Sequence, residues 1–177
     1  MPFAALVSKL IDYKHTKKRV IYIALSHRVW YGQGKGGVKM ENVEQFVGEL
    51  FEGQNLSFIG SVDENGFPAI RAMLRPRKRE GMKTIWFSTN TPTHKVQHFK
   101  SNSNACVYFC DPAGFRGALL VGRMEVLEAQ EYKAMLWQEG DELYYPGGVS
   151  DPNYCVLLFR TERYNLMIDW QEIGGTV

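Results

Sequence analysis

Short strand-like segments separated by turn-forming residues constrain the fold of this chain more than any other feature of its sequence. Leu56 to Val62 and Phe67 to Leu74 flank the turn Asp63-Glu64-Asn65-Gly66, and this pattern predicts an antiparallel β-hairpin. Similar β-branched and aromatic segments predict further strands at residues 83–89, 105–110, 115–128, 154–160 and 164–170. Many short antiparallel strands favour a mainly β fold, a closed or nearly closed barrel.

A few helices interrupt the strands. Apolar residues at helical spacing predict a first helix between Asn42 and Gly53, and residues 93–100 and 131–139 predict two more. Residues 75–81 are predicted to form a charged turn, and residues 141–153 an irregular loop. The helices are therefore expected at the periphery of the barrel.

Composition excludes several classes of protein. A chain of 177 residues, 45% of them hydrophobic, is expected to form one domain. Its 21 basic and 19 acidic residues leave a net charge of +2, without the global field of a nucleic-acid or membrane-surface binder. The basic run at residues 75–79 lacks interleaved aromatics and is interpreted as a solvated turn. No window approaches the ~20 apolar residues of a membrane span.

Three cysteines, Cys106, Cys110 and Cys155, show no disulfide-framework spacing. We interpret them as reduced, small apolar residues, which favours a cytoplasmic protein.

The first 39 residues differ from the rest and are interpreted as an N-terminal extension or linker, with the main domain at residues 40–177. Their Gly-rich run formally contains a G-x-G-x-x-G pattern, but no clean strand leads into it and no βαβ unit follows. A second hypothesis is that Lys35-Gly36-Gly37 is a translated ribosome-binding sequence and that Met40 is the natural start. Peptides from residues 1–39 in the natively expressed protein would contradict this second hypothesis.

The segment from Ser88 to Lys95 has the composition of a phosphate site. It runs from a strand end through Thr91-Pro92 into a helix that Thr93 can cap. Cations in a first helical turn are unfavourable against the helix dipole unless an anion binds there. The free backbone N–H groups, the hydroxyls and the cations His94 and Lys95 together are what a phosphate needs, although a solvated surface lysine is the simpler alternative.

Arg71 strengthens the phosphate hypothesis. Strand alternation places it on one face with Ala69 and Met73, and places Ile70, Ala72 and Leu74 on the other. An arginine among small and apolar neighbours needs a partner, either a carboxylate or the same phosphate. His94 and His98 are also four residues apart, but no third ligand is in register, so no metal site is predicted.

A set of short segments occurs in a fixed order along most of the chain. They are Phe58-Ile59-Gly60-Ser61-Val62-Asp63-Glu64-Asn65-Gly66-Phe67-Pro68, Arg71-Ala72-Met73-Leu74, Ser88-Thr89, His94-Lys95, Trp137, Tyr145-Pro146-Gly147-Gly148, Asp151-Pro152, Leu157-Leu158-Phe159-Arg160 and Trp170. In this ordered combination the chain resembles the pyridoxamine 5'-phosphate oxidase-like family of FMN-binding proteins, and specifically its short general-stress-protein branch. The resemblance covers about residues 43–170.

This resemblance implies an FMN-binding split β-barrel of antiparallel Greek-key type, a homodimer with the flavin at the interface and completed by residues of the partner subunit. His94 and Lys95 would hold the phosphate, and Ser88 and Thr89 the ring or the ribityl chain. The full set of implied flavin contacts is Arg71, Ala72, Met73, Leu74, Ser88, Thr89, His94, Lys95, Arg116 and Trp170. The family has another flavin contact in the segment Phe115-Arg116-Gly117, but Gly117 has no side chain that could make it.

The function that the resemblance implies is an FMN-dependent oxidoreductase that passes electrons between a nicotinamide donor and a small-molecule substrate. No general base stands out in the sequence, and the C-terminal segment that helps true oxidases bind pyridoxal phosphate has no counterpart here. Two alternatives stay open: a non-catalytic flavin- or haem-binding stress-response protein, and a reductase that uses the deazaflavin F420.

Overall fold

A computed structural model describes residues 40–177 of the chain. The predicted N-terminal extension and the Gly-rich run lie outside the described residues. Within residues 40–177, no helix is both long and apolar enough to cross a membrane.

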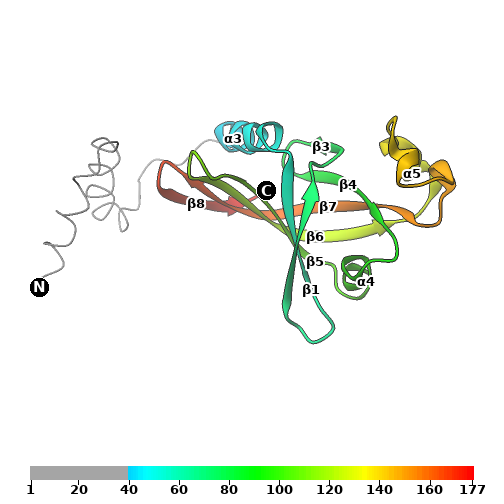
Figure 1. Ribbon diagram of the computed structural model, residues 1–177. Helices are drawn as coiled ribbons and strands as arrows, with labels where there is room; N and C mark the ends of the chain where they lie inside the picture. Colours follow the sequence, from blue (N-terminus) through cyan, green and yellow to red (C-terminus); the bar gives the residue numbers. More distant parts are fainter. Residues whose placement is uncertain (1–39) are drawn as a thin grey trace, which may run out of the picture. The chain divides into compact units, whose positions relative to one another are not determined.

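The described part is a mainly antiparallel β structure with peripheral helices, as predicted (Figure 1). Its hydrogen-bonded strands follow the order β2-β1-β5-β6-β7-β4-β3, and β8 also pairs with β7. The elements are α3 (Met40–Gly53), β1 (Leu56–Val62), β2 (Pro68–Leu74), β3 (Lys78–Glu80), β4 (Thr84–Asn90), α4 (His94–Ser101), β5 (Asn104–Asp111), β6 (Arg116–Leu127), α5 (Gln130–Leu136), the 3-10 turns η1 (Asp141–Leu143) and η2 (Gly148–Ser150), β7 (Tyr154–Ile168) and β8 (Gln171–Thr176).

The hairpin of β1 and β2 forms where the sequence predicts it. Its turn is closed by the Asp63 carboxylate, which accepts hydrogen bonds from the backbone N–H groups of Asn65 and Phe67. Gly66 takes the left-handed conformation with φ of 84°. In the resulting register Ile59 lies opposite Arg71, which fixes the face on which Arg71 stands.

The two separate strands predicted at residues 154–160 and 164–170 are wrong, because both belong to one long strand, β7. Its first half pairs with β4 and its second half with β8, while β6 runs along its other edge. The predicted break is a β-bulge: Val121 pairs with Arg163 and Gly122 with Thr161, which leaves Glu162 as the extra residue.

The sequence also missed two strands. The predicted turn at residues 75–81 contains β3, which pairs with the edge of β4, and the residues after Trp170 form β8. Asp169 and Trp170 take left-handed conformations at the β7–β8 turn, and the Trp170 ring stacks on Phe115 with centroids 4.2 Å apart. Long-range backbone pairing and this stack, rather than local propensity, define β8.

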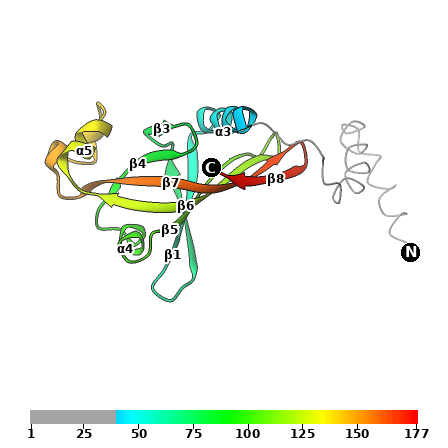
Figure 2. The same ribbon diagram turned by 180° about the vertical axis from the view of Figure 1, so that it is seen from behind.

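Two hydrophobic clusters lie on opposite faces of the strand pair β4–β7. The larger fills the barrel and includes the inward side chains of α3 and α4, such as Phe46 and Phe99. The smaller lies under α5 and contains Trp86, Tyr145 and Tyr154. Figures 1 and 2 show α3 and α4 on different sides of the strands and α5 near one end of the long strands.

Candidate functional site

The start of α4 presents unsatisfied hydrogen-bond donors. Thr93 is the cap residue, as predicted, but its hydroxyl donates to the backbone oxygen of Asn90 at 2.9 Å instead of capping the helix. Within residues 40–177, the backbone N–H groups of His94 and Lys95 have no acceptor. An anion at this helix end would satisfy them and would interact favourably with the helix dipole.

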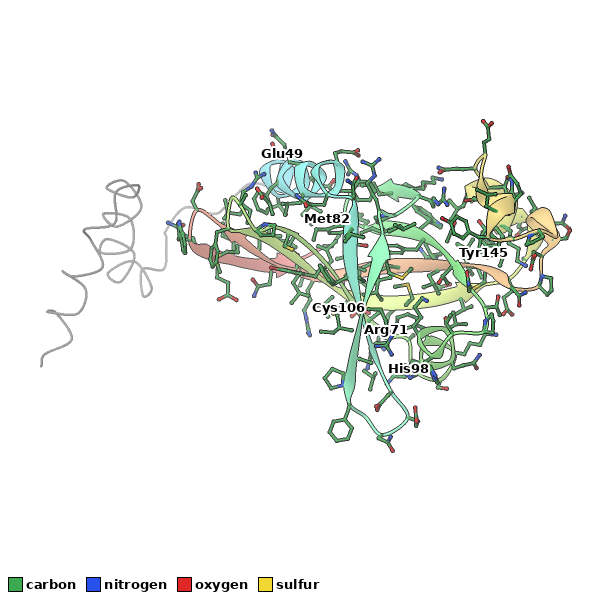
Figure 3. The ribbon with its side chains drawn as sticks, viewed as in Figure 1. Glu49, Arg71, Met82, His98, Cys106 and Tyr145 are labelled. Atoms are coloured by element: carbon green, nitrogen blue, oxygen red, sulfur yellow. The ribbon has the colours of Figure 1, made fainter. Side chains whose placement is uncertain are left out.

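Two cations from different elements meet near this helix end. Lys95 is half-buried, and its amine donates to the Thr93 hydroxyl at 3.3 Å. Burial lowers the pKa of Lys95. Cys155 acts to raise this pKa, and the positive charge of Arg71 lowers it further. Arg71 on β2 is therefore close enough to act on the Lys95 amine, and Figure 3 shows Arg71 in the region of α4.

Neither cation has a carboxylate partner within residues 40–177. The guanidinium of Arg71 donates to the backbone oxygen of Ile70, its own neighbour. Two neighbouring like charges repel each other, so an added negative charge would stabilise the arrangement.

A groove of about 990 Å³ on another part of the surface contains more cations but is a weaker anion site. It is lined by the basic run of residues 75–79 together with Phe51, Leu74 and Gln138. Each of its cations faces a carboxylate: Arg75 and Arg79 face Glu52, Arg77 faces Asp141, and Lys78 faces Glu80. Three carboxylates offset most of the charge of its four cations, whereas Arg71 and Lys95 have no carboxylate partner within residues 40–177.

Alternation along β4 separates two of the predicted site residues. Thr89 is buried on the barrel face, opposite Cys155, on the same side as the large cluster. Ser88 points to the other face, where its hydroxyl lies 3.3 Å from the Tyr154 hydroxyl. Cys155 acts to raise the pKa of Lys95, so Lys95 lies on the side of Thr89, and the Ser88 side chain points away from this group.

The turn before α4 contains a residue that the sequence did not single out. The Thr91 hydroxyl oxygen is buried without a nitrogen or oxygen partner within residues 40–177, and the thiol of Cys155 lies beside it. A buried hydroxyl without a full set of hydrogen bonds is unusual. The signal available in the sequence was its position, two residues before the cap.

The remaining predicted residues of β2 divide between its two faces as expected. Met73 packs against the large cluster on the face of Arg71. Ala72 and Leu74 are exposed on the other face, together with Ile70, which is 64% exposed. Register brings Leu56, Phe58 and Tyr108 next to them, so an apolar surface extends over β2, β1 and β5; we call it the outer apolar face.

Arg116 and Trp170 lie away from α4. Arg116 begins β6, whereas α4 reaches the other end of that strand through the ion pair of Lys100 with Glu128. Eleven residues of strand separate the two ends by roughly 36 Å. Arg116 is bound to Glu49 and Asp111, and Trp170 is 40% exposed in its stack with Phe115. A single chain thus does not bring these two residues to Lys95.

The two histidines of α4 have different surroundings. His94 is exposed at the helix start, whereas His98 is largely buried, with its Nδ1 3.0 Å from the Ser61 hydroxyl. His98 therefore faces β1.

The tyrosines under α5 serve the packing of the small cluster. Burial, with smaller effects from Tyr154 and other neighbours, raises the pKa of Tyr145 to about 12, and its hydroxyl donates to the Asn90 side chain at 2.8 Å. Tyr145 is therefore neutral at physiological pH and is unsuited to act as a general base.

Comparisons with known proteins identify the family and the fold of the chain. Residues 28–168 match the family described as pyridoxamine 5'-phosphate oxidase. No curated protein matches the chain significantly. A solved structure from Clostridium acetobutylicum, of a protein related to general stress protein 26 of B. subtilis, is 39% identical, with a TM-score of 0.71 over 77% of this chain and 96% of that one.

Two more distant structures share the fold. General stress protein 26 from Bacillus anthracis is 16% identical, with a TM-score of 0.61 over 75% of this chain and 98% of that one. A pyridoxamine 5'-phosphate oxidase-related, FMN-binding protein from Nostoc punctiforme is 14% identical, with a TM-score of 0.58 over 77% of this chain and 95% of that one. From the family match over residues 28–168 and the 39% identical structure, the chain belongs to the pyridoxamine 5'-phosphate oxidase family.

Proposed function

We propose that this protein is an FMN-dependent oxidoreductase that binds the cofactor's phosphate between Arg71 and Lys95. The observation that carries the proposal is that these two cations lie close enough to affect each other at the start of α4, and that neither has a carboxylate partner within residues 40–177. Family membership and the FMN-binding relative from Nostoc punctiforme support the choice of flavin as the ligand.

The residues present fit a phosphate monoester. Such a group carries a charge near −2 and three strong acceptor oxygens. Arg71 and Lys95 supply the opposite charge, and the free N–H groups of His94 and Lys95 supply donors. Thr89 and the Thr91 hydroxyl lie on the barrel side of the same region, where they are candidates for the ribityl chain.

When bound, FMN supplies electron transfer between a nicotinamide donor and a small-molecule acceptor. This chain contributes binding and orientation. Burial raises the pKa of the Cys155 thiol beside the site, which is therefore unsuited to acid–base chemistry at neutral pH. We also propose a cytoplasmic location, which the three free cysteines favour.

The active form in this proposal is a homodimer that places the flavin at the subunit interface. The outer apolar face suggests a contact surface, since Leu56, Ile70 and Leu74 are each at least 50% exposed and contiguous exposed apolar residues are typical of protein–protein interfaces. A second copy of the chain would cover it. In a homodimer, Arg116 and Trp170 of one subunit would complete the site formed by Arg71 and Lys95 of the other.

An absorbance spectrum of the purified protein, taken before and after addition of FMN and desalting, tests the proposal. Retained flavin bands are the expected result, and anaerobic bleaching by reduced nicotinamide followed by reoxidation with an acceptor would establish turnover. Flavin bands without bleaching would identify a non-catalytic binder. A Soret band would identify haem as the cofactor. Uptake of deazaflavin F420 but not of FMN would identify F420.

A further inference from the structure

His98 connects the helix that carries Lys95 to the hairpin that carries Arg71. It lies one helical turn after Lys95 on α4, and its side chain is only 10% exposed. Its Nδ1 is 3.0 Å from the hydroxyl of Ser61 on β1, and its Nε2 is 3.8 Å from the carboxylate of Glu64 in the β1–β2 turn. Figure 3 shows His98 on α4, in the region of Arg71.

The partner of His98 is itself fixed in the hairpin. Ser61 is 4% exposed and pairs with Ala69 on β2, two residues before Arg71. Its hydroxyl also lies 3.5 Å from the backbone oxygen of Ala69. A displacement of His98 relative to Ser61 would therefore change the position of α4 relative to the strand that bears Arg71.

The other polar side chains of α4 do not make this connection. Lys95 bonds to Thr93, Ser101 to Gln97, and Lys100 to Glu128. Within residues 40–177, the His98–Ser61 contact is thus the only side-chain hydrogen bond between α4 and the strands of the hairpin. Val96 and Phe99 add apolar packing, which resists separation of the helix but is less directional than a hydrogen bond.

The two cations repel each other when no anion is bound, so a directional tie would help to hold them in place. Binding groups that are held at the correct separation in advance avoid the ordering cost at the moment of binding. We infer that His98 is a positioning residue for the phosphate site: through Ser61 it sets the separation between Lys95 and Arg71. This inference rests on the proposed function, and it makes His98 a determinant of phosphate recognition without contact with the phosphate.

The test compares the dissociation constants of FMN and riboflavin, measured by quenching of flavin fluorescence. H98A is expected to weaken FMN about tenfold, the effect of one hydrogen bond, and to leave riboflavin nearly unchanged. H98N, whose amide can occupy the place of Nδ1, should restore most of the lost affinity. Q97A is the matched control, because Gln97 is exposed on the same helix and its side chain makes no hydrogen bond within residues 40–177.

The S61A variant provides an independent route to the same interaction. It should reproduce the selective loss of FMN affinity, and the double variant H98A/S61A should lose no more than either single variant. If H98A leaves the ratio of FMN affinity to riboflavin affinity unchanged, the positioning role is overturned. A wild-type protein that does not prefer FMN to riboflavin would instead refute the proposed function, and the inference with it.

Discussion

At the scale of single residues, Arg71 and Lys95 decide how the cofactor is recognised. R71A and K95A should each weaken FMN more than tenfold and riboflavin much less, because a hydrogen bond to a charged group contributes about 1.5–3 kcal/mol. Titration of flavin fluorescence with each ligand measures both constants. R75A is the control, since Arg75 directly follows β2 and already faces the carboxylate of Glu52. An equal loss for the two flavins would contradict phosphate contact.

The lowered pKa of Lys95 gives a second residue-scale prediction, for alkaline pH. Because its pKa in the fold lies below that of an exposed lysine, the native chain binds fewer protons there than the unfolded chain between the two values. The contribution of Lys95 to stability therefore improves as pH rises through that window. Phosphate affinity changes in the opposite direction, because the phosphate needs the charged ammonium.

The ratio of FMN affinity to riboflavin affinity should accordingly fall as pH rises through the pKa of Lys95. This fall should occur at a pH below about 10.4, the pKa of an exposed lysine. Using the ratio cancels changes in the flavin ring that both ligands share. K95R should hold the ratio constant to higher pH, since a guanidinium stays protonated. A ratio that declines identically in wild type and K95R would argue against Lys95.

At the scale of elements, the bulge between β6 and β7 depends on Gly122. A Cβ at this position would lie 1.9 Å from the backbone oxygen of Arg160, and backbone atoms cannot move aside as a flexible side chain can. G122A should therefore destabilise the protein by about 3 kcal/mol, the upper part of the usual range for overpacking. The urea unfolding midpoint measures the change.

G174A is the control for this prediction. Gly174 also lies in a strand, β8, but its Cβ would meet the backbone oxygen of Tyr164 at 3.5 Å, an ordinary contact. Its unfolding midpoint should stay close to that of the wild type. If G122A unfolds at the same urea concentration as G174A, the close approach at the bulge is not required for the long strand β7.

At the scale of the whole molecule, the outer apolar face predicts the oligomeric state. Light scattering should give a mass twice the 20.3 kDa of one chain. I70E places a charge on that face, on its edge strand β2, and should yield monomers that no longer retain FMN after desalting. L143E is the matched control, because Leu143 is 83% exposed in η1, outside this face. A wild-type monomer, or an I70E dimer that keeps its flavin, would refute the proposed interface.

The sequence alone determined the features that depend on local periodicity. Alternation in β2 placed Arg71 on one face of the strand and Ile70 on the other, and the turn from Asp63 to Gly66 located the hairpin. Helical spacing and Thr93 located α4 and put Lys95 in its first turn. Each of these depends on neighbours within a few residues, whose directions follow from the repeat of a strand or a helix.

Only the tertiary structure decided which distant residues meet. The bulge at Glu162 joined two predicted strands into β7, and pairing with the edges of β4 and β7 created β3 and β8. Folding also brought Arg71 to Lys95 and His98 to Ser61, while it turned Ser88 away toward Tyr154. Local sequence could not specify these contacts, because strand pairing and helix docking depend on packing between segments that are far apart along the chain.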